Sequence, residues 1–195
     1  MKKLLITGFD PFGGEQINPS WEAVKALPDR IGDYHITKME IPTVFGTAAQ
    51  MIIDQAKELV PDVIISVGQA GGRKAVTPEV IGINLREAGI PDNAGNQPVN
   101  TPVVPDGPDA YFSTLPVREM VQSIRTAELP AALSYSAGAF VCNDVLYTLL
   151  HHFAGTGTRV GFIHVPFLPQ QATNGQPSLP LDQITQALTL AISAL

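Results

Sequence analysis

The chain has 195 residues, of which 45% are hydrophobic and 15% are charged, and its formal net charge is −6. A chain of this length suits one domain with a single core, so we expect one domain over residues 1–195. The acidic balance and the lack of any run of lysine or arginine argue against a nucleic-acid partner and against an anionic membrane surface.

Cysteine usage and the N-terminal segment bear on where the protein works. The single cysteine, Cys142, cannot form a disulfide within the chain, which is typical of a reducing compartment. The apolar run at the N-terminus stops after Ile6, which is too short for a signal peptide. No stretch approaches the length of a transmembrane helix. We therefore expect a cytoplasmic protein with no membrane partner.

Strand-like and helix-like segments alternate along the chain. The expected elements, in chain order, are strand 2–8, helix 21–27, strand 34–41, helix 46–60, strand 62–68, strand 76–85, helix 115–129, short strand 131–135, helix 139–153, strand 158–165 and helix 181–195. Asn18 and Pro19 mark the start of the first helix, as its N-cap and its first helical residue. The alternation predicts an α/β fold with a twisted, mostly parallel sheet that is covered by helices on both faces.

Two segments between these elements are long and rich in proline. Residues 91–110 contain five prolines, and a second irregular stretch runs from Pro169 to Pro180. Loops of this length inside a compact domain are usually functional or packed against a neighbour. We expect either segment to serve as a lid or as a contact between subunits.

Candidate chemistry gathers at the carboxyl ends of the expected strands, where open α/β sheets bind their ligands. The glycine-rich GQAGG follows the strand at 62–68, and the turn Ser-Ala-Gly precedes the helix that carries Cys142. A thiol in the first turn of a helix lies near unpaired N–H groups and the positive end of the helix dipole. Both favour the thiolate, which is the reactive form.

A cysteine nucleophile needs a base, and the base needs a group that orients it. His151 and His152 share the helix of Cys142 and lie about 13–15 Å further along its axis, too far to pair with the thiol. His35 has no glycine-rich turn beside it, which leaves His164 as the candidate base. Among the carboxylates, Glu79 follows the GQAGGR loop and could reach the same edge of the sheet.

Each of these residues also has an ordinary structural interpretation. A free cysteine at a helix start is more often a small buried apolar residue, and a histidine near a strand end is usually hydrogen-bonded in the core. Glu79 taken alone suits a solvated strand charge. The loop GFDPFGG lacks the lysine of a phosphate-binding loop, and the sequence has no zinc-type cysteine spacing and no G-x-S-x-G motif.

Five motifs taken together resemble one family. The segments GFDPFGG…NPS, GQAGGR…TPE…IN, IPDN…G…QP, SAGAFVCN and GFIHVPFLPQQ are similar, in order and spacing, to the pyroglutamyl-peptidase I family over nearly the whole chain. The resemblance implies a cysteine peptidase that removes an N-terminal pyroglutamyl residue from peptides without a metal or cofactor. It also implies a single α/β domain that assembles as a homodimer or homotetramer.

The resemblance assigns roles to particular residues. The nucleophile falls on Cys142, the base on His164 and the orienting acid on Glu79. The residues expected to bind the lactam ring are Phe9, Phe12 and Phe140 on its faces, and Asn18, Gln69 and Val141 at its edges. For the phenylalanines, ordinary core packing is the preferred interpretation without the resemblance. The N–H groups of Cys142 and of the turn Gly71-Gly72 are the expected oxyanion donors.

The sequence departs from the family pattern at two positions. The family commonly has arginine directly after the acid and before the I-x-D-N segment, where this chain has Val80 and Gly89. Arg86 is a candidate replacement for a lost cation. These departures keep open a second hypothesis, a non-catalytic binding protein for a lactam or a blocked peptide end. A nucleotide or nucleoside enzyme is a third hypothesis that rests on fold analogy alone.

Overall fold

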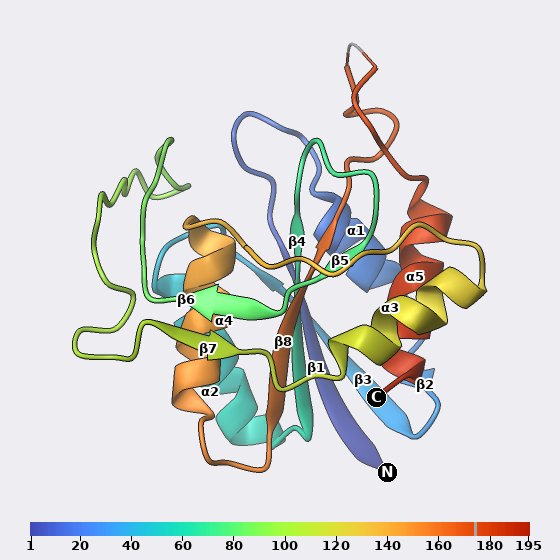
Figure 1. Ribbon diagram of the computed structural model, residues 1–195, viewed down its shortest axis with the longest axis horizontal. Helices are drawn as coiled ribbons and strands as arrows, with labels where there is room; N and C mark the ends of the chain where they lie inside the picture. Colours follow the sequence, from blue (N-terminus) through green and yellow to red (C-terminus); the bar gives the residue numbers. More distant parts are fainter. Residues whose placement is uncertain (174) are drawn as a thin grey trace.

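The computed structural model describes residues 1–173 and 175–195 and is built around one large sheet (Figure 1). Its six strands lie in the order β2-β3-β1-β4-β8-β5. They span Lys2–Phe9 (β1), Arg30–Ile31 (β2), Tyr34–Ile41 (β3), Val63–Gln69 (β4), Thr77–Pro78 (β5) and Arg159–Val165 (β8). The neighbours β3, β1, β4 and β8 run parallel, whereas β2 and β5 at the edges are antiparallel to the strands beside them. The mostly parallel sheet confirms the expected α/β fold.

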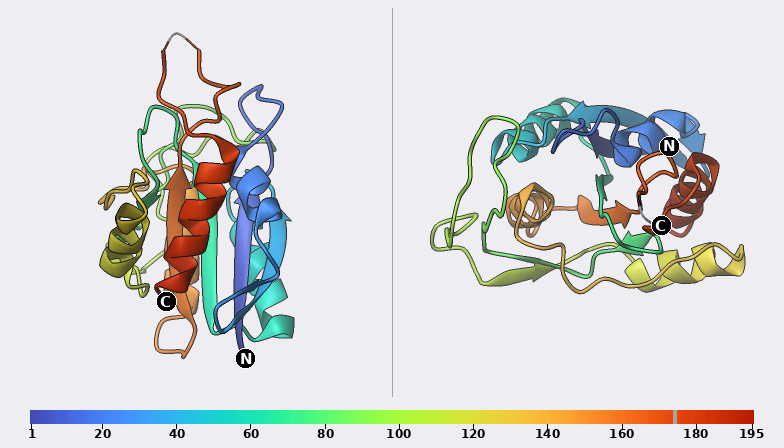
Figure 2. Two further views of the ribbon diagram at one scale, coloured as in Figure 1. Left: turned by 90° about the vertical axis from the view of Figure 1, so that its right-hand side faces the viewer. Right: turned by 90° about the horizontal axis from the view of Figure 1, so that it is seen from above.

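Five helices cover the two faces of the sheet. They span Pro19–Ala26 (α1), Thr47–Leu59 (α2), Val117–Thr126 (α3), Val141–His152 (α4) and Leu181–Ser193 (α5). The helices α1, α3 and α5 lie on one face and α2 and α4 on the other (Figures 1 and 2). Their apolar side chains pack against the sheet from both sides. None of the helices in the described part of the chain is both long and apolar enough to cross a membrane.

The central strands are apolar on both sides because both of their faces are covered. Leu4, Leu5 and Ile6 are consecutive residues of β1, and all three are fully buried. Leu4 and Ile6 point toward the helices on one face, and Leu5 points toward those on the other. Full burial of each such side chain stabilises the fold by about 1.5–3 kcal/mol, which fixes the register of the central strands.

A second, two-stranded sheet packs against α4. It is formed by β6 (Ile81–Ile83) and β7 (Ala110–Phe112), which pair antiparallel. The buried side chain of Asn143 joins this sheet to the helix. Its Oδ1 accepts from the N–H of Ile83 at 2.9 Å, and its Nδ2 donates to the carbonyls of Ile83 at 2.8 Å and Leu85 at 3.0 Å. The first turn of α4, next to Cys142, is thereby held in place.

Most expected elements form within two or three residues of the predicted limits, but two expectations about strands were wrong and two short strands were missed. The strand expected at 76–85 is split into β5 and β6, which belong to different sheets. The segment 131–135 makes only isolated bridges, from Ala131 to Val76 and from Ser134 to Glu79. The short strands β2 and β7 were not predicted. Pro78 explains the split in part, since it has no N–H to donate and suits only a short edge strand.

Candidate active site

Several loops converge at the carboxyl end of the parallel strands, which is the upper end of the molecule in Figure 1 and lies opposite both chain termini. His164 of β8 lies in register with Gly68 of β4 on one side and with Thr77 of β5 on the other. The backbone N–H of Glu79 donates to the carbonyl of Phe162 at 2.9 Å, so the residue after β5 is carried to the same place. The fold thus brings together segments that lie far apart along the chain.

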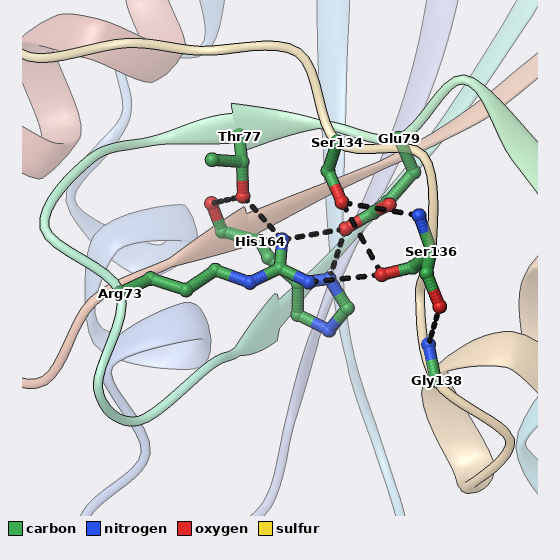
Figure 3. A network of polar contacts seen from close by, with 7 residues as sticks. All are labelled: Arg73, Thr77, Glu79, Ser134, Ser136, Gly138 and His164. Carbon is green, nitrogen blue, oxygen red and sulfur yellow. Dashed lines mark hydrogen bonds and ion pairs between the residues drawn. The ribbon is translucent and has the colours of Figure 1, made fainter.

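His164 and Glu79 form a buried pair (Figure 3). The Nδ1 of His164 lies 2.7 Å from Oε1 of Glu79, and the two residues are 3% and 0% exposed. A carboxylate at this distance accepts the Nδ1 proton, so the neutral imidazole presents Nε2 as a proton acceptor. The pair therefore has the geometry of a base and the group that orients it.

The pKa values of this pair favour a neutral imidazole and an ionised carboxylate. Burial raises the pKa of Glu79, but the hydrogen bond and charge of His164 outweigh it, with smaller contributions from Ser134 and Arg73, so the pKa lies below its ordinary value. Burial lowers the pKa of His164. The Glu79 carboxylate partly offsets this effect, and the charge of Arg73 lowers the pKa further. At neutral pH the imidazole is therefore able to take up a proton.

Cys142 is the second residue of α4, at the start of the helix, as the sequence predicts. A β-carbon added to Gly68 would lie 2.8 Å from the Cys142 sulfur and 2.8 Å from the ring of Phe162. The thiol therefore rests directly on the glycine that neighbours His164 in the sheet. In the described part of the chain, no hydrogen bond joins Cys142 to His164. Both residues neighbour Gly68 and the ring of Phe162, which puts them at the same edge of the sheet.

The acidity of this thiol differs from the sequence prediction. Burial raises the pKa of Cys142 to about 12, the negative charge of Glu79 acts in the same direction, and Arg73 and the residue's own N–H oppose both. The helix start does not make the resting group a thiolate, because desolvation outweighs the helix dipole. Cys142 is therefore a protonated thiol before any ligand binds.

The first turn of α4 offers N–H groups to the site. The N-cap residue, Phe140, has an apolar side chain, and no side chain in the described part of the molecule caps this end. The N–H groups of Val141 and Cys142 are thus available to a bound ligand. Val141 itself is fully buried, so its side chain belongs to the core.

Three aromatic rings line up beside this helix start. The centroids of Phe12 and Phe140 are 6.2 Å apart, and Phe45 meets Phe140 edge to face at 5.2 Å. Phe45 was missed from the sequence, where only its place between β3 and α2 could have drawn attention to it. Phe9 is 2% exposed and packs on Phe162 at 6.2 Å, so it supports the wall from within the core.

Two expected ligand-binding residues use polar atoms to hold the protein together. Asn18 accepts from the N–H of Ser20 at 3.1 Å, which caps α1 as predicted, and its Nδ2 donates to the carbonyl of Asp10 at 2.9 Å. The Oε1 of Gln69 accepts from Nε2 of Gln171 at 3.0 Å. The structure therefore gives both amides a structural role at the edge of the site.

The turn that carries Gly71 and Gly72 is fixed by two constraints. A β-carbon on Gly71 would collide with the ring of Phe167, and Gly72 has a φ of +85°, which favours glycine. Directly after this turn, Arg73 places Nη1 2.7 Å from Oε1 of Glu79. Arg73 was missed from the sequence, because a single arginine after a glycine-rich loop resembles an ordinary surface residue.

Two positions, Val80 and Gly89, depart from the family pattern. A side chain on Gly89 would meet no atom within 4 Å in the described structure, and Val80 donates its N–H to the carbonyl of Ser134 at 2.8 Å. The Nη2 of Arg86 lies 2.6 Å from the buried carboxylate of Asp144, and its guanidinium lies 5.9 Å from the centroid of Phe45. The charge of Arg86 is therefore paired with Asp144.

In residues 1–173 and 175–195, no cluster of three or more histidine, cysteine, aspartate or glutamate side chains is placed to hold a metal.

The chain is similar to known peptidases over nearly its whole length. The family model described as pyroglutamyl peptidase matches residues 2–195. The chain is 53% identical over 197 residues to the pyrrolidone-carboxylate peptidase of Levilactobacillus brevis, covering 99% of this chain and 97% of that one. It is 52% identical over 196 residues to the enzyme of the same name from Enterococcus faecalis, covering 98% and 92%.

Solved structures give the same result. The crystal structure of pyroglutamyl peptidase I from Bacillus amyloliquefaciens is 48% identical, with a TM-score of 0.96 and coverage of 100% of this chain and 96% of that one. The pyrrolidone carboxyl peptidase of Thermococcus litoralis is 37% identical, with a TM-score of 0.95 and coverage of 100% and 93%. On sequence and fold alike, this chain belongs to the pyroglutamyl peptidase family.

Proposed function

We propose that this protein is a cysteine peptidase that removes an N-terminal pyroglutamyl residue from peptides, with Cys142 as nucleophile, His164 as base and Glu79 as the orienting acid. The observation that carries the proposal is the meeting of this thiol and this buried imidazole–carboxylate pair at one sheet edge. Membership of the family supports the same reaction. The hypothesis of a non-catalytic binding protein has no comparable observation in its favour.

The reaction follows from the protonation states of the free protein. As the carbonyl carbon of the pyroglutamyl group approaches, the Cys142 sulfur attacks it and the thiol proton passes to Nε2 of His164. The tetrahedral intermediate collapses, the peptide amine leaves with the proton from His164, and a thioester remains on Cys142. His164 then takes a proton from water, the hydroxide attacks the thioester, and the thiol and free pyroglutamate are released.

Glu79 orients the imidazole of His164 and stabilises its charged form during this cycle. Its carboxylate holds the Nδ1 proton of His164, so that the lone pair of Nε2 faces the reacting atoms. When His164 becomes an imidazolium, the same carboxylate stabilises the charge without itself taking up the proton. Since the thiol pKa is high, proton transfer to His164 accompanies the attack on the carbonyl.

The negative oxygen of the tetrahedral intermediate must be stabilised by hydrogen-bond donors that point toward it. The N–H of Cys142 at the uncapped start of α4 and those of the Gly71-Gly72 turn are the candidates. Loss of one such donor typically lowers kcat by about 10²–10³. The helix dipole at this end also favours a negative oxygen over a neutral carbonyl.

The pocket chemistry suits a pyroglutamyl ring. The ring is a flat, neutral lactam without an ammonium group, so it is bound best by apolar walls and a few hydrogen bonds. The aromatic wall of Phe12, Phe45 and Phe140 supplies such a surface beside the Cys142 turn. The backbone of Val141 and the edge residues Asn18 and Gln69 are the proposed sources of hydrogen bonds.

The proposal extends to the organisation of the molecule. We expect all 195 residues to form one catalytic domain that works in the cytoplasm as a homodimer or homotetramer. Large hydrophobic side chains exposed in and near the proline-rich loop, such as Ile90 at 48% and Val99 at 63%, support self-association. Sedimentation of the full chain at several concentrations tests the oligomeric state, and a monomer throughout would contradict it.

The direct test of the function is release of a chromophore from a pyroglutamyl amide. The wild type is expected to release it and Cys142→Ala is expected to be inactive, while both keep the same thermal unfolding temperature. Equal rates for the two proteins would end the claim that Cys142 is the nucleophile. Binding of the amide without turnover by the wild type would favour the binding-protein hypothesis instead.

A further inference from the structure

Arg73 links three segments that surround the buried imidazole–carboxylate pair (Figure 3). Its Nη1 lies 2.7 Å from Oε1 of Glu79 and 2.6 Å from Oγ1 of Thr77. Its Nη2 donates to the carbonyl of Ser136 at 3.0 Å. One planar guanidinium therefore joins the loop after β4 to β5, to the candidate acid and to the turn before α4, as only a forked donor can.

The first of these contacts supports the negative charge of Glu79, after the larger effects of His164 and Ser134. Its Oε1 accepts from both His164 and Arg73, whereas its Oε2 has no hydrogen-bond partner among the described residues. Arg73 is also the one lysine or arginine that forms an ion pair with this fully buried carboxyl in the described part of the chain. A buried carboxyl without a cation tends to take up a proton. The guanidinium therefore adds to the hydrogen bond of His164 in favouring the ionised form, which is a pure acceptor for the Nδ1 proton.

The contact of Arg73 with the carbonyl of Ser136 helps to position the candidate nucleophile, Cys142. The carbonyl of Ser136 also accepts from the hydroxyl of Ser134 at 3.2 Å, and the hydroxyl of Ser136 accepts from the N–H of Gly138 at 3.2 Å. Gly138 has a φ of +77°, so the chain turns sharply there before it enters α4. Arg73 therefore anchors the turn that delivers Cys142 to the sheet edge.

We propose that Arg73 is a positioning residue of this site, which fixes Glu79 beside His164, holds the turn ahead of Cys142 and thereby sets the pH range in which His164 serves as base. This inference rests on the proposed function, since it concerns the same thiol and imidazole. Arg73 contacts Glu79 and Ser136, and it acts through them.

The pH dependence follows from the charges that face the pair. The titratable groups are Arg73, Glu79, His164 and Cys142, and the other groups that face them are neutral, namely Gly68 of β4, Thr77 of β5, Ser134, Ser136 and Phe162 of β8. The positive charge of Arg73 lowers the pKa of both Cys142 and His164. Its removal therefore raises both, and both limbs of a pH–rate profile move to higher pH, whichever group each limb reports.

The test compares Arg73→Gln and Arg73→Lys with the control Arg125→Gln. Arg125 also donates to a backbone carbonyl, that of Ala131 at 2.8 Å, but it lies outside the ion-pair network, so the control removes the same charge elsewhere. For Arg73→Gln we expect kcat/KM of a pyroglutamyl amide to fall at least about tenfold, and both limbs of its pH profile to rise by about 0.5–1 pH unit. Arg125→Gln should keep the wild-type rate and profile.

Arg73→Lys separates the two roles of the guanidinium. It keeps the charge, so both limbs should return to their wild-type positions, but an ammonium cannot reach Glu79 and Ser136 together, so kcat should stay about tenfold low. A folded Arg73→Gln with the wild-type profile would overturn the proposal. If Arg73→Gln does not fold, Arg73→Lys decides, because wild-type kcat in that variant would overturn the positioning role.

A readout without turnover keeps this inference distinct from the proposed function. The rate at which iodoacetamide alkylates Cys142, measured against pH, should shift to higher pH in Arg73→Gln and remain unchanged in Arg125→Gln. If the wild type hydrolyses no pyroglutamyl amide and yet this shift appears, the proposed function fails and the role of Arg73 stands. Turnover by the wild type without any shift in Arg73→Gln would overturn the role of Arg73 alone.

Discussion

The sulfur of Cys142 rests against the backbone of Gly68, so close that a β-carbon on this glycine would lie 2.8 Å from it. Gly68 is in turn the register partner of His164 on the neighbouring strand. The absence of a side chain at this strand position thus leaves room for the thiol next to the strand that carries His164. The φ of Gly68 lies outside the left-handed region, so its requirement for glycine is one of space and not of backbone conformation.

Gly68→Ala tests this relationship. The added methyl group would force the Cys142 side chain and the Phe162 ring apart, and we expect the free energy of unfolding to fall by about 1–3 kcal/mol. Because the thiol is displaced from His164, the loss of kcat should exceed what the loss of stability explains. Urea unfolding and amide hydrolysis measure the two effects. Gly157→Ala is the matched control, since a β-carbon there meets nothing within 4 Å in the described structure.

Glu79→Gln removes the charge of the orienting group and keeps its shape. The neutral amide can present its N–H to His164 and hold the wrong tautomer, so we expect kcat to fall by about 10³–10⁴, as in related triads. Steady-state hydrolysis of a pyroglutamyl amide gives the value. Glu22→Gln is the control, because Glu22 forms only a surface ion pair with Lys25. A change of less than tenfold in Glu79→Gln would remove Glu79 from the mechanism.

The resting state of the thiol can be measured directly. Since burial raises the pKa of Cys142 to about 12, alkylation by iodoacetamide should accelerate with pH through pH 9 without reaching a plateau. The same protein unfolded in urea should instead titrate near pH 8.5, the ordinary value of a cysteine thiol. A plateau of the folded protein below neutral pH would show a preformed thiolate and contradict the proposed order of proton transfer.

The pKa shifts of the buried pair also predict how stability depends on pH. The pKa of His164 is lowered from 6.5, so below that pH the unfolded state binds more protons and the free energy of unfolding falls. The pKa of Glu79 is lowered from 4.5, so its contribution is present above that pH and is lost as the pH falls through the folded value. Both effects weaken the fold in acid.

Urea unfolding of the wild type and of His164→Gln between pH 5 and pH 7.5 isolates the first effect. The wild type should lose stability as the pH drops through this window, and the variant should show a smaller slope, because glutamine does not titrate. His35→Gln is the control, since His35 is exposed. Identical slopes for wild type and His164→Gln would show that the buried imidazole does not resist protonation.

Elements with a regular apolar pattern were predictable from the sequence. The helices at α2 and α5 have apolar residues at helical spacing, and β1 and β4 are short apolar runs bounded by glycine or proline. The segment 76–85 was predicted wrongly because local preference does not reveal that β6 pairs with β7, a partner almost thirty residues away in sequence. Pairing over such distances depends on tertiary packing.

The site could be predicted only in part, because its geometry also depends on pairing between segments that are distant in the sequence. The motifs around Cys142, Glu79 and His164 predict that these residues meet at one edge of the sheet, and the structure pairs Glu79 with His164 there. Their mutual distances depend on the register of β8 with β4 and β5, which no local pattern gives. The high pKa of Cys142 follows from burial, and the sequence could supply only the opposing effect of the helix start.

The central claim is that Cys142 carries the pyroglutamyl group during turnover. Rapid acid quenching of the enzyme with a pyroglutamyl amide, followed by peptide mass analysis, measures this directly. We predict that the peptide containing Cys142 gains the mass of one pyroglutamyl group, and that Cys142→Ala shows no gain. Steady turnover with an unmodified Cys142 at every quench time, under conditions in which thioester hydrolysis is slowed, would contradict the account.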